Sequence, residues 1–349
     1  MENKNAVKNA PATVAKIRSI YGKRLRSDDF SEMLECRTVQ EAAEFLKNTA
    51  AYGETLASVD TNTVHRGLLE DLLHKHEFMT YIRVAGFEQL NKQEFFNFRI
   101  LREEIEQILE CIRYINAGET DKHIQTMPVY MNKYLSFDMI GLAQVKSFSD
   151  LLDFTSKTEY HNLLKFFAPE EGEKIDYTGC EVRLRRYYYN RLMESAELFG
   201  KKTADELSEF IGVQTDLINI INSYRMTAYF HEDAEKIRRL MLPFGHMSQE
   251  KMEELYASAD GEDFARRLEK TYYGRLMKRS GIESDDLETA ALRLQYDHFR
   301  RELASVQAAP AAVYAFNYLM ENEVRNIIRV IEGIRYSVPR KNIEPLLIL

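Results

Sequence analysis

The chain has 349 residues, which exceeds the size at which a single hydrophobic core usually stops growing, so two or three domains are expected. Its 45% hydrophobic and 29% charged residues are typical of a soluble globular protein, and 15 glycines, 7 prolines and no tryptophan favour long helices over strands. The net charge of −8 argues against nucleic-acid binding as the main function, because phosphate recognition needs clustered Lys and Arg.

The three cysteines, Cys36, Cys111 and Cys180, are far apart and lack zinc-site spacing, so we expect reduced thiols in a cytoplasmic protein. The N-terminal segment 1–16 has no apolar core of the kind a secretory signal needs, so no signal peptide is expected there. No apolar run approaches the roughly 18 residues that a membrane-spanning helix needs. We therefore expect any association with a membrane to be indirect, through a protein partner.

Helical spacing of apolar residues appears from the start of the chain. Residues 12–27 form the first predicted helix, and a short helix over 30–36 follows a candidate N-cap at 27–29. Thr38 and Glu41 fit a capping box. The stretch 61–90 is amphipathic. A long helix over 92–117 is predicted to end at Gly118, a typical C-cap residue.

Two later interruptions predict boundaries between repeated units. The polar segment 118–127 ends at Pro128, and Pro243 with Gly245 breaks a second helical pattern. We therefore predict three domains, residues 1–122, 123–242 and 243–349. Each has short helices, a Thr–Tyr element, a central amphipathic helix and a long closing helix. No strand block occurs in the sequence, and Asp260-Gly261 fits a turn between helices, so the predicted fold is all-α.

A pattern that recurs three times supports this division. The closing helices carry an acid before an apolar stripe, at Glu104, Asp216 and Glu323. The upstream Thr–Tyr elements place their tyrosines at positions 52, 160 and 273. Both features recur with one period of roughly 110 residues, which indicates a triplicated domain, because solenoid repeats are only about 20–50 residues long. We expect three similar helical bundles.

The sequence of these repeats predicts no catalytic, cofactor-binding or metal-binding residue. His74 and His76 are two residues apart and do not share a helix face, and no HExxH motif is present. Nucleophile and phosphate-binding motifs are absent from the sequence. The segment 183–191 is rich in Arg and Tyr. We favour buried tyrosines with arginine heads in solvent over a nucleic-acid stacking platform.

The repeated polar residues are interpreted first as structural. An acid and an amide three residues later share one face of each closing helix, and we expect Glu104 and Asp216 to satisfy backbone groups between helices. Thr158 and Thr271 are predicted to cap helices, with the tyrosine that follows each one wedged into the bundle and its hydroxyl at the edge. The third copy is the most polar, so Glu323, Asn326 and Arg329 are candidates for a partner contact as well as a structural role. The apolar end, 345–349, is expected to dock on the protein, with a partner-binding tail as the alternative.

These features together resemble the C subunits of bacterial and archaeal V/A-type rotary ATPases and ATP synthases, which are similar to the eukaryotic d subunits. The resemblance rests on the three Thr–Tyr elements, the LPFG junction at 242–245, and Glu323, Asn326, Arg329 and Gly333 at their spacing in the last helix. It covers about residues 12–345. The first Thr–Tyr element has an extra residue, and the first two closing helices lack the full Asn–Arg–Gly pattern.

The resemblance implies three helical bundles arranged as a pseudo-threefold funnel on the cytoplasmic face of the membrane. It further implies a non-catalytic rotor subunit of the central stalk, which couples a shaft of subunits D and F to the proteolipid (c/K) ring for ATP-linked proton or sodium transport. Two alternatives stay open: a soluble α-helical scaffold that binds a helical partner in a groove, and an all-α enzyme with an unrecognised site.

Overall fold

The structure is a computed structural model that describes residues 10–170, 172–279 and 287–349. Helices and turns make up this part of the chain, and no strand occurs in it, which confirms the all-α prediction. Six long helices form the body: α5 (Arg66–Gly86), α6 (Phe98–Ala117), α11 (Tyr177–Glu197), α12 (Lys201–Ala228), α17 (Leu287–Ser305) and α18 (Ala309–Arg335).

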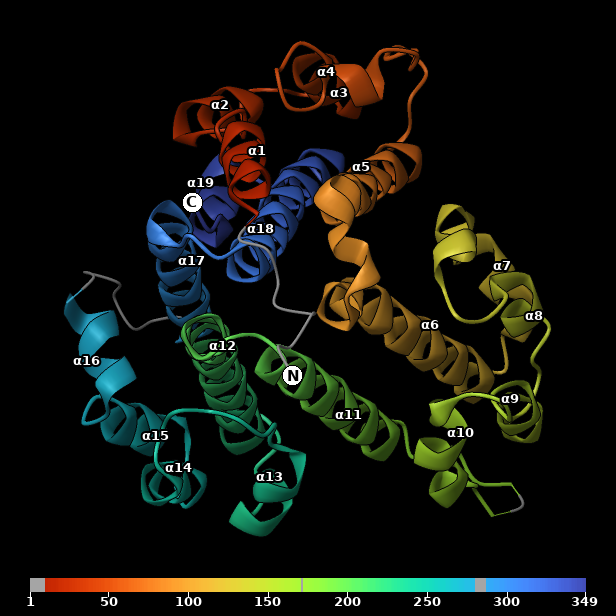
Figure 1. The fold of residues 1–349 in the computed structure, drawn as a ribbon, viewed down its shortest axis with the longest axis vertical. Helices are drawn as coiled ribbons and strands as arrows, with labels where there is room; N and C mark the ends of the chain where they lie inside the picture. Colours follow the sequence, from red (N-terminus) through yellow and green to blue (C-terminus); the bar gives the residue numbers. More distant parts are fainter. Residues whose placement is uncertain (1–9, 171, 280–286) are drawn as a thin grey trace, which may run out of the picture.

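Three peripheral groups of short helices surround this body (Figure 1). The first group is α2 (Ser27–Met33), α3 (Val39–Lys47) and α4 (Gly53–Leu56). The second is α7 (His123–Thr126), α8 (Met139–Ala143), α9 (Phe148–Phe154) and α10 (Glu159–Leu164). The third is α13 (Ala234–Leu240), α14 (Gln249–Tyr256), α15 (Gly261–Leu268) and α16 (Tyr272–Arg279). The predicted order within each unit, from short helices to a long closing helix, is confirmed.

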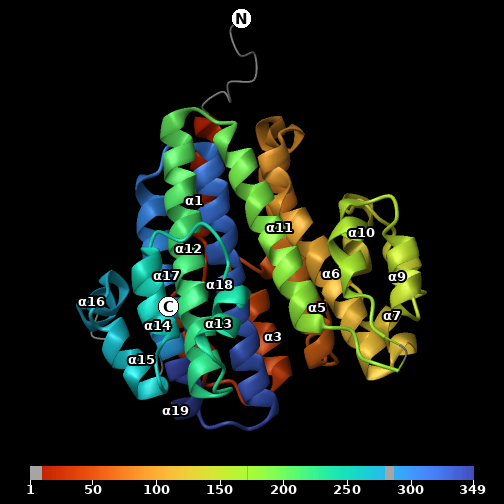
Figure 2. The same cartoon turned by 90° about the horizontal axis from the view of Figure 1, so that it is seen from below.

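The remaining helices join these parts. Helix α1 (Pro11–Tyr21) packs along α18, and α19 (Arg340–Ile343) lies near the C-terminal end of α18. Short 3-10 turns complete the described chain: η1 (Phe87–Lys92), η2 (Glu94–Asn97), η3 (Thr120–Lys122), η4 (Val129–Tyr134), η5 (Lys165–Phe167) and η6 (Glu344–Leu346). Turned by 90°, the molecule shows α11, α12 and α18 side by side, with the second and third groups on opposite flanks (Figure 2).

The hydrophobic clusters join segments that are far apart in the sequence, including the two ends of the chain. One cluster joins the first group to α18, as Phe30, Leu46 and Tyr52 pack with Val324 and Ile331. Another joins the third group to α12 and α17, and the largest fills the centre and continues beneath the second group. The first group therefore packs on the last long helix, which closes the chain into a ring. The three predicted domains and the two boundaries between them stay predictions, since they mark sequence repeats and not these clusters.

Several predicted helix ends are shifted. Helix α1 ends at Tyr21, not at 27, and α2 begins at Ser27 because the Asp29 carboxylate accepts the Arg26 backbone N–H at 2.7 Å. The amphipathic stretch 61–90 is helical only over 66–86, and the predicted helix 92–117 begins at residue 98, because residues 87–97 form two 3-10 turns. Glu88 there has a positive φ of 53°, and its carboxylate accepts hydrogen bonds from the Thr13 N–H and hydroxyl. The left-handed C-cap at Gly118 and the turn at Asp260 are confirmed.

Each repeated acid accepts a hydrogen bond from a repeated tyrosine. Tyr160 donates to Glu104 at 2.6 Å, Tyr273 to Asp216 at 2.7 Å, and Tyr52 to Glu323 at 2.9 Å. All three hydroxyl contacts are buried, so the prediction that these hydroxyls lie at the bundle edge is wrong. The tyrosine ring enters the core far enough to bring its hydroxyl to a carboxylate that would otherwise be buried with too few donors.

Backbone donors complete these sites, as predicted for the first two acids. Glu104 accepts the Ser136 N–H, and Asp216 accepts the N–H groups of His246 and Met247, both at 2.9 Å. Of the two threonines predicted to cap helices, one does so and the other does not. The Thr271 hydroxyl accepts from Gly274 at 3.2 Å, as predicted, whereas the Thr158 hydroxyl donates to the Thr155 carbonyl at 2.8 Å and caps no helix.

Replacing Tyr273 with Phe tests how much one such pair stabilises the fold. Asp216 is buried and keeps its two backbone donors, but it loses the phenol, so Tyr273→Phe should lower the free energy of unfolding by about 1–3 kcal/mol. The neighbouring Tyr272 is 62% exposed. Tyr272→Phe is the matched control, with an expected change within about 0.5 kcal/mol. Equal urea midpoints for the two variants would contradict a stabilising role of the pair.

Candidate functional site

A cavity of about 490 Å³ lies between α5, α6, α18 and the segment 126–131. Its lining is dominated by charged side chains. They are Asp71, His74, Glu77, Arg99, Arg102, Glu103, Glu106, Glu110, Arg113, Glu321 and Arg325. Helices usually pack through apolar side chains, so a charged lining between three long helices differs from the hydrophobic core around it.

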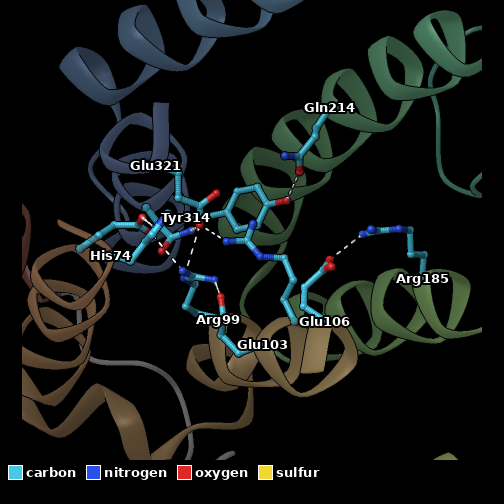
Figure 3. Close-up of polar contacts among 11 residues, drawn as sticks. His74, Arg99, Glu103, Glu106, Arg185, Gln214, Tyr314 and Glu321 are labelled. Atoms are coloured by element: carbon cyan, nitrogen blue, oxygen red, sulfur yellow. Dashed lines mark hydrogen bonds and ion pairs between the residues drawn. The ribbon is translucent and has the colours of Figure 1, made fainter. Parts of the chain in front are cut away.

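Arg99 of α6 is the centre of an ion-pair network in this lining (Figure 3). Its guanidinium donates to Glu77 of α5 at 2.9 Å, contacts Glu103 on its own helix, and lies 3.4 Å from Glu321 of α18. Arg102, one turn further along α6, also pairs with Glu321. The network therefore joins three long helices, the last of them far from the other two in the sequence.

The network is largely shielded from water. The side chains of Arg99 and Glu77 are only 8% and 5% exposed. Burial opposes ionisation of Glu77, but attraction to Arg99 and other nearby cations outweighs it and holds the pKa of that carboxyl below its usual range. Removing one member would leave its partner buried and uncompensated, which typically costs several kcal/mol. These charges thus fix how α5, α6 and α18 pack together.

Two further contacts extend the polar lining toward the other long helices (Figure 3). Tyr314 of α18 donates to Gln214 of α12, and Glu106 of α6 pairs with Arg185 of α11 at 3.0 Å. Arg185 belongs to the Arg- and Tyr-rich segment 183–191. Tyr188 and Tyr189 of that segment are buried as predicted, but Arg185 is held by an ion pair instead of simply reaching solvent.

Glu323, the first residue predicted from the last helix, holds the N-terminal part of the chain. Its Oε1 atom accepts both the Tyr52 hydroxyl, at 2.9 Å, and the Leu25 backbone N–H, at 3.2 Å. Burial raises the pKa of Glu323 to about 7, against the opposing effect of these two donors. The side chain is not part of the charged cavity, although it borders a smaller one of about 260 Å³.

Asn326 and Arg329 hold the C-terminal end. The Asn326 side chain donates to the Ile348 carbonyl at 2.7 Å and accepts the Ile348 N–H at 3.1 Å. Arg329 donates to the Leu346 carbonyl at 2.9 Å. Ile348 is 1% exposed, so the predicted docking of the C-terminal end on the protein is confirmed. All three predicted residues thus bond within the chain, and a partner contact through them stays a prediction.

Sequence reasoning missed the residues that line the charged cavity. Glu321 and Arg325 are four residues apart on α18, on either side of Glu323, and both line the cavity. Arg99, Arg102 and Glu103 form a charged cluster that is ordinary for a solvated helix face. One signal was present: after the uncharged stretch 309–320, Glu321 and Arg325 follow at a spacing of four, which places them on one face of the helix.

The histidines were considered in the sequence as possible metal ligands. Across the described residues, no three His, Cys, Asp or Glu side chains are placed to hold a metal ion. His74 Nδ1 lies 3.9 Å from Glu77, whereas His76 Nδ1 is 2.6 Å from the Thr55 hydroxyl oxygen. None of the described helices is both long and apolar enough to cross a membrane.

Comparison with known proteins gives one consistent result. A profile of the family described as ATP synthase (C/AC39) subunit matches residues 13–346. The chain is 26% identical to the C subunit of the A-type ATP synthase of Pyrococcus abyssi, over 95% of this chain and 88% of that protein. Identity to the corresponding C subunit of Thermococcus kodakarensis is 24%, over 90% and 83%, and to that of Pyrococcus horikoshii 26%, over 95% and 88%.

Substituting Glu323 tests the pH dependence that its burial implies. The folded chain keeps a proton on Glu323 from the ordinary pKa of 4.5 up to about 7, whereas the unfolded chain releases it. The free energy of unfolding therefore falls as pH rises through this window. Glu323→Gln keeps an acceptor oxygen but cannot ionise, so its stability relative to the parent should rise by up to about 3 kcal/mol between pH 4.5 and 8. A pH-independent difference in urea unfolding would contradict this.

Substituting Asn326 tests the attachment of the C-terminal end. Asn326→Ala leaves the buried N–H of Ile348 without its partner, so the free energy of unfolding should fall by about 2 kcal/mol. Hydrogen exchange at Ile348 should accelerate as well. Asn342, which is exposed, provides the control variant Asn342→Ala. Unchanged exchange at Ile348 in Asn326→Ala would show that apolar packing alone holds the end.

Proposed function

The chain belongs to the ATP synthase (C/AC39) subunit family, and we propose that it is the non-catalytic central-stalk subunit that joins the rotating shaft to the membrane rotor ring. The shaft consists of subunits D and F, and the ring of proteolipid subunits. In this role the protein passes rotation between ATP chemistry and the transport of protons or sodium ions.

The observation that carries the proposal is the charged cavity enclosed by long helices of different repeats. Its lining comes from α5, α6 and α18, and it extends over about 490 Å³. We propose that the three peripheral groups surround a pseudo-threefold axis as a funnel, with this cavity as part of its socket. The end of the shaft would bind there through polar contacts.

The packing suits the transmission of torque. Buried ion pairs and close-packed side chains join helices from all parts of the chain, and interiors packed at crystal-like density resist deformation. A scaffold that binds an amphipathic helix would need an apolar groove, whereas this cavity is lined mainly by charges. The rotor role therefore accounts for the lining better than the scaffold role.

We propose that the contact with the proteolipid ring lies on the side of the long-helix body that faces away from the charged cavity. None of the described helices could cross a membrane, so association would run through the cytoplasmic face of the ring. Membrane attachment and coupling would then both depend on protein contacts.

The proposal is tested by binding and by coupling. The purified chain should retain the D–F shaft in one pull-down and the detergent-solubilised proteolipid ring in another, and retention of neither would overturn the assignment. A complex assembled without this subunit should keep ATP hydrolysis by its detached head but lose ATP-driven ion transport into vesicles. Adding the purified subunit back is the control, and it should restore transport.

Loss of hydrolysis in a detached and correctly assembled head that lacks this subunit would contradict the coupling role. It would place the protein in the catalytic cycle itself.

A further inference from the structure

A second cavity, of about 260 Å³, lies beside Glu323, where the first peripheral group meets the long helices. Helices α1, α5 and α18 pack against one another there, and α4 packs on α5 (Figure 1). Three cationic side chains line the cavity: Lys23 and Arg24, which follow α1, and Arg83 of α5. The carboxyl groups of Glu54 and Glu323 also line it. We call this space the basic cavity.

The three cations are not neutralised by ion pairs. Among the described residues, no carboxylate lies within ion-pair distance of Lys23, Arg24 or Arg83. Arg24 is held by other contacts, since it donates to the Tyr21 carbonyl at 3.1 Å and lies over the Tyr21 ring. Like charges that share a cavity repel one another. An anion bound between them would remove this repulsion.

The two carboxyl groups of the lining do not cancel the positive charge. Glu323 accepts hydrogen bonds from Tyr52 and Leu25, and burial raises its pKa to about 7, so below that pH the group is mostly neutral. Glu54 is exposed and forms no ion pair within the described part of the chain. Three cations therefore face one or two negative charges, and the cavity is positive in either case.

Uncharged polar groups line the same cavity. His76, Thr80 and Arg83 are spaced by four and three residues, which places them on one face of α5. Thr80 is only 3% exposed, yet its hydroxyl has no hydrogen-bond partner among the described residues. Buried hydroxyls normally have a partner, so a free one beside three cations points to an acceptor that binds in the cavity.

We propose that the basic cavity binds a phosphate group, carried by inorganic phosphate or by a small phosphate monoester. The guanidinium groups of Arg24 and Arg83 match the oxygen atoms of phosphate, Lys23 adds a further positive charge, and the Thr80 hydroxyl donates to one oxygen. Cavities for drug-sized ligands measure about 300–1,000 Å³, so this smaller one suits a small anion and not a whole nucleotide. The inference goes beyond the proposed function and does not depend on it.

The cavity at the equivalent place in the second repeat has a different chemistry. It lies beside Glu104, the repeat equivalent of Glu323, and measures about 340 Å³. The basic side chain of its lining, Arg191, pairs with Glu94. Its other lining residues include aromatic and apolar side chains, such as Phe95, Leu101, Tyr134 and Tyr187. The anion site is therefore specific to the first peripheral group, where a bound phosphate bridges α5 and the segment after α1.

Calorimetric titration of the full chain tests the proposal. Inorganic phosphate and glycerol 3-phosphate are the two probes, at constant ionic strength and at a pH of about 6.5, where Glu323 is mostly protonated. At least one probe should bind at a single site with a Kd of about 1 mM or lower. Tighter binding of the first probe identifies the free anion as the ligand, and tighter binding of the second identifies a monoester. No saturable binding of either probe up to about 10 mM would overturn the proposal.

Charge variants show whether the lining itself makes the contact. Arg83→Gln should weaken binding of phosphate about tenfold, whereas Glu54→Gln should strengthen it about threefold, because it removes a negative charge. Lys75→Gln is the matched control, since it removes a cation from an exposed position on α5 outside this lining, and it should change the affinity by less than about twofold. Equal weakening by Arg83→Gln and Lys75→Gln would overturn the site.

Thr80→Val separates a ligand contact from a structural role. Valine has nearly the shape of threonine but lacks the hydroxyl, which has no partner among the described residues. The urea midpoint without phosphate should therefore stay unchanged or rise, while the affinity for phosphate falls about fivefold. An unchanged affinity, with a lower midpoint in the absence of phosphate, would show that the hydroxyl serves the fold and would contradict its role as a donor to the anion.

Discussion

Three buried carboxylates determine how this chain folds on itself. Glu104, Asp216 and Glu323 each lie on a closing helix, and each needs donors because burying an unpaired carboxylate is costly. The donors include one tyrosine hydroxyl from the peripheral group that follows in space, and one or two backbone N–H groups complete each site. A group that detached would strand a charge in the core. Each group is therefore bound to its helix more specifically than apolar packing alone would achieve.

The same kind of hydrogen bond also links the two ends of the chain. The tyrosine of the second group binds an acid 56 residues earlier and that of the third group one 57 residues earlier, but Tyr52 binds an acid 271 residues later. The third copy thus connects the two ends of the chain. Arg18 adds a second connection, since it donates to the Val306 carbonyl at 2.7 Å. This position explains why Glu323, Asn326 and Arg329 look more polar than bundle packing requires: they bind the first group and the C-terminal end together.

Sequence periodicity predicted the elements of this arrangement but not their pairing. The acids and tyrosines were visible because they recur with one period, and the helix order followed from apolar spacing and from breakers such as Gly118. A repeated pattern does not indicate which tyrosine pairs with which acid. In the structure, each tyrosine donates to the acid of the preceding unit, and the first unit follows the third in space. Residues 87–97, which form the 3-10 turns, contain neither glycine nor proline, so no helix-breaking residue within this range predicts them. The charged cavity depends on Glu77, Arg99 and Glu321, which meet only through tertiary packing.

The polar contacts that recur in all three repeats suit the proposed task. Acid–tyrosine pairs present in all three repeats make a closed body in which no peripheral group is held by apolar contacts alone. Each closing helix also holds a second backbone segment by two hydrogen bonds from one asparagine: Asn116 to Ile175, Asn219 to Leu242 and Asn326 to Ile348. Resistance to deformation therefore comes from repeated polar contacts as well as from close packing, and transmission of torque requires such resistance.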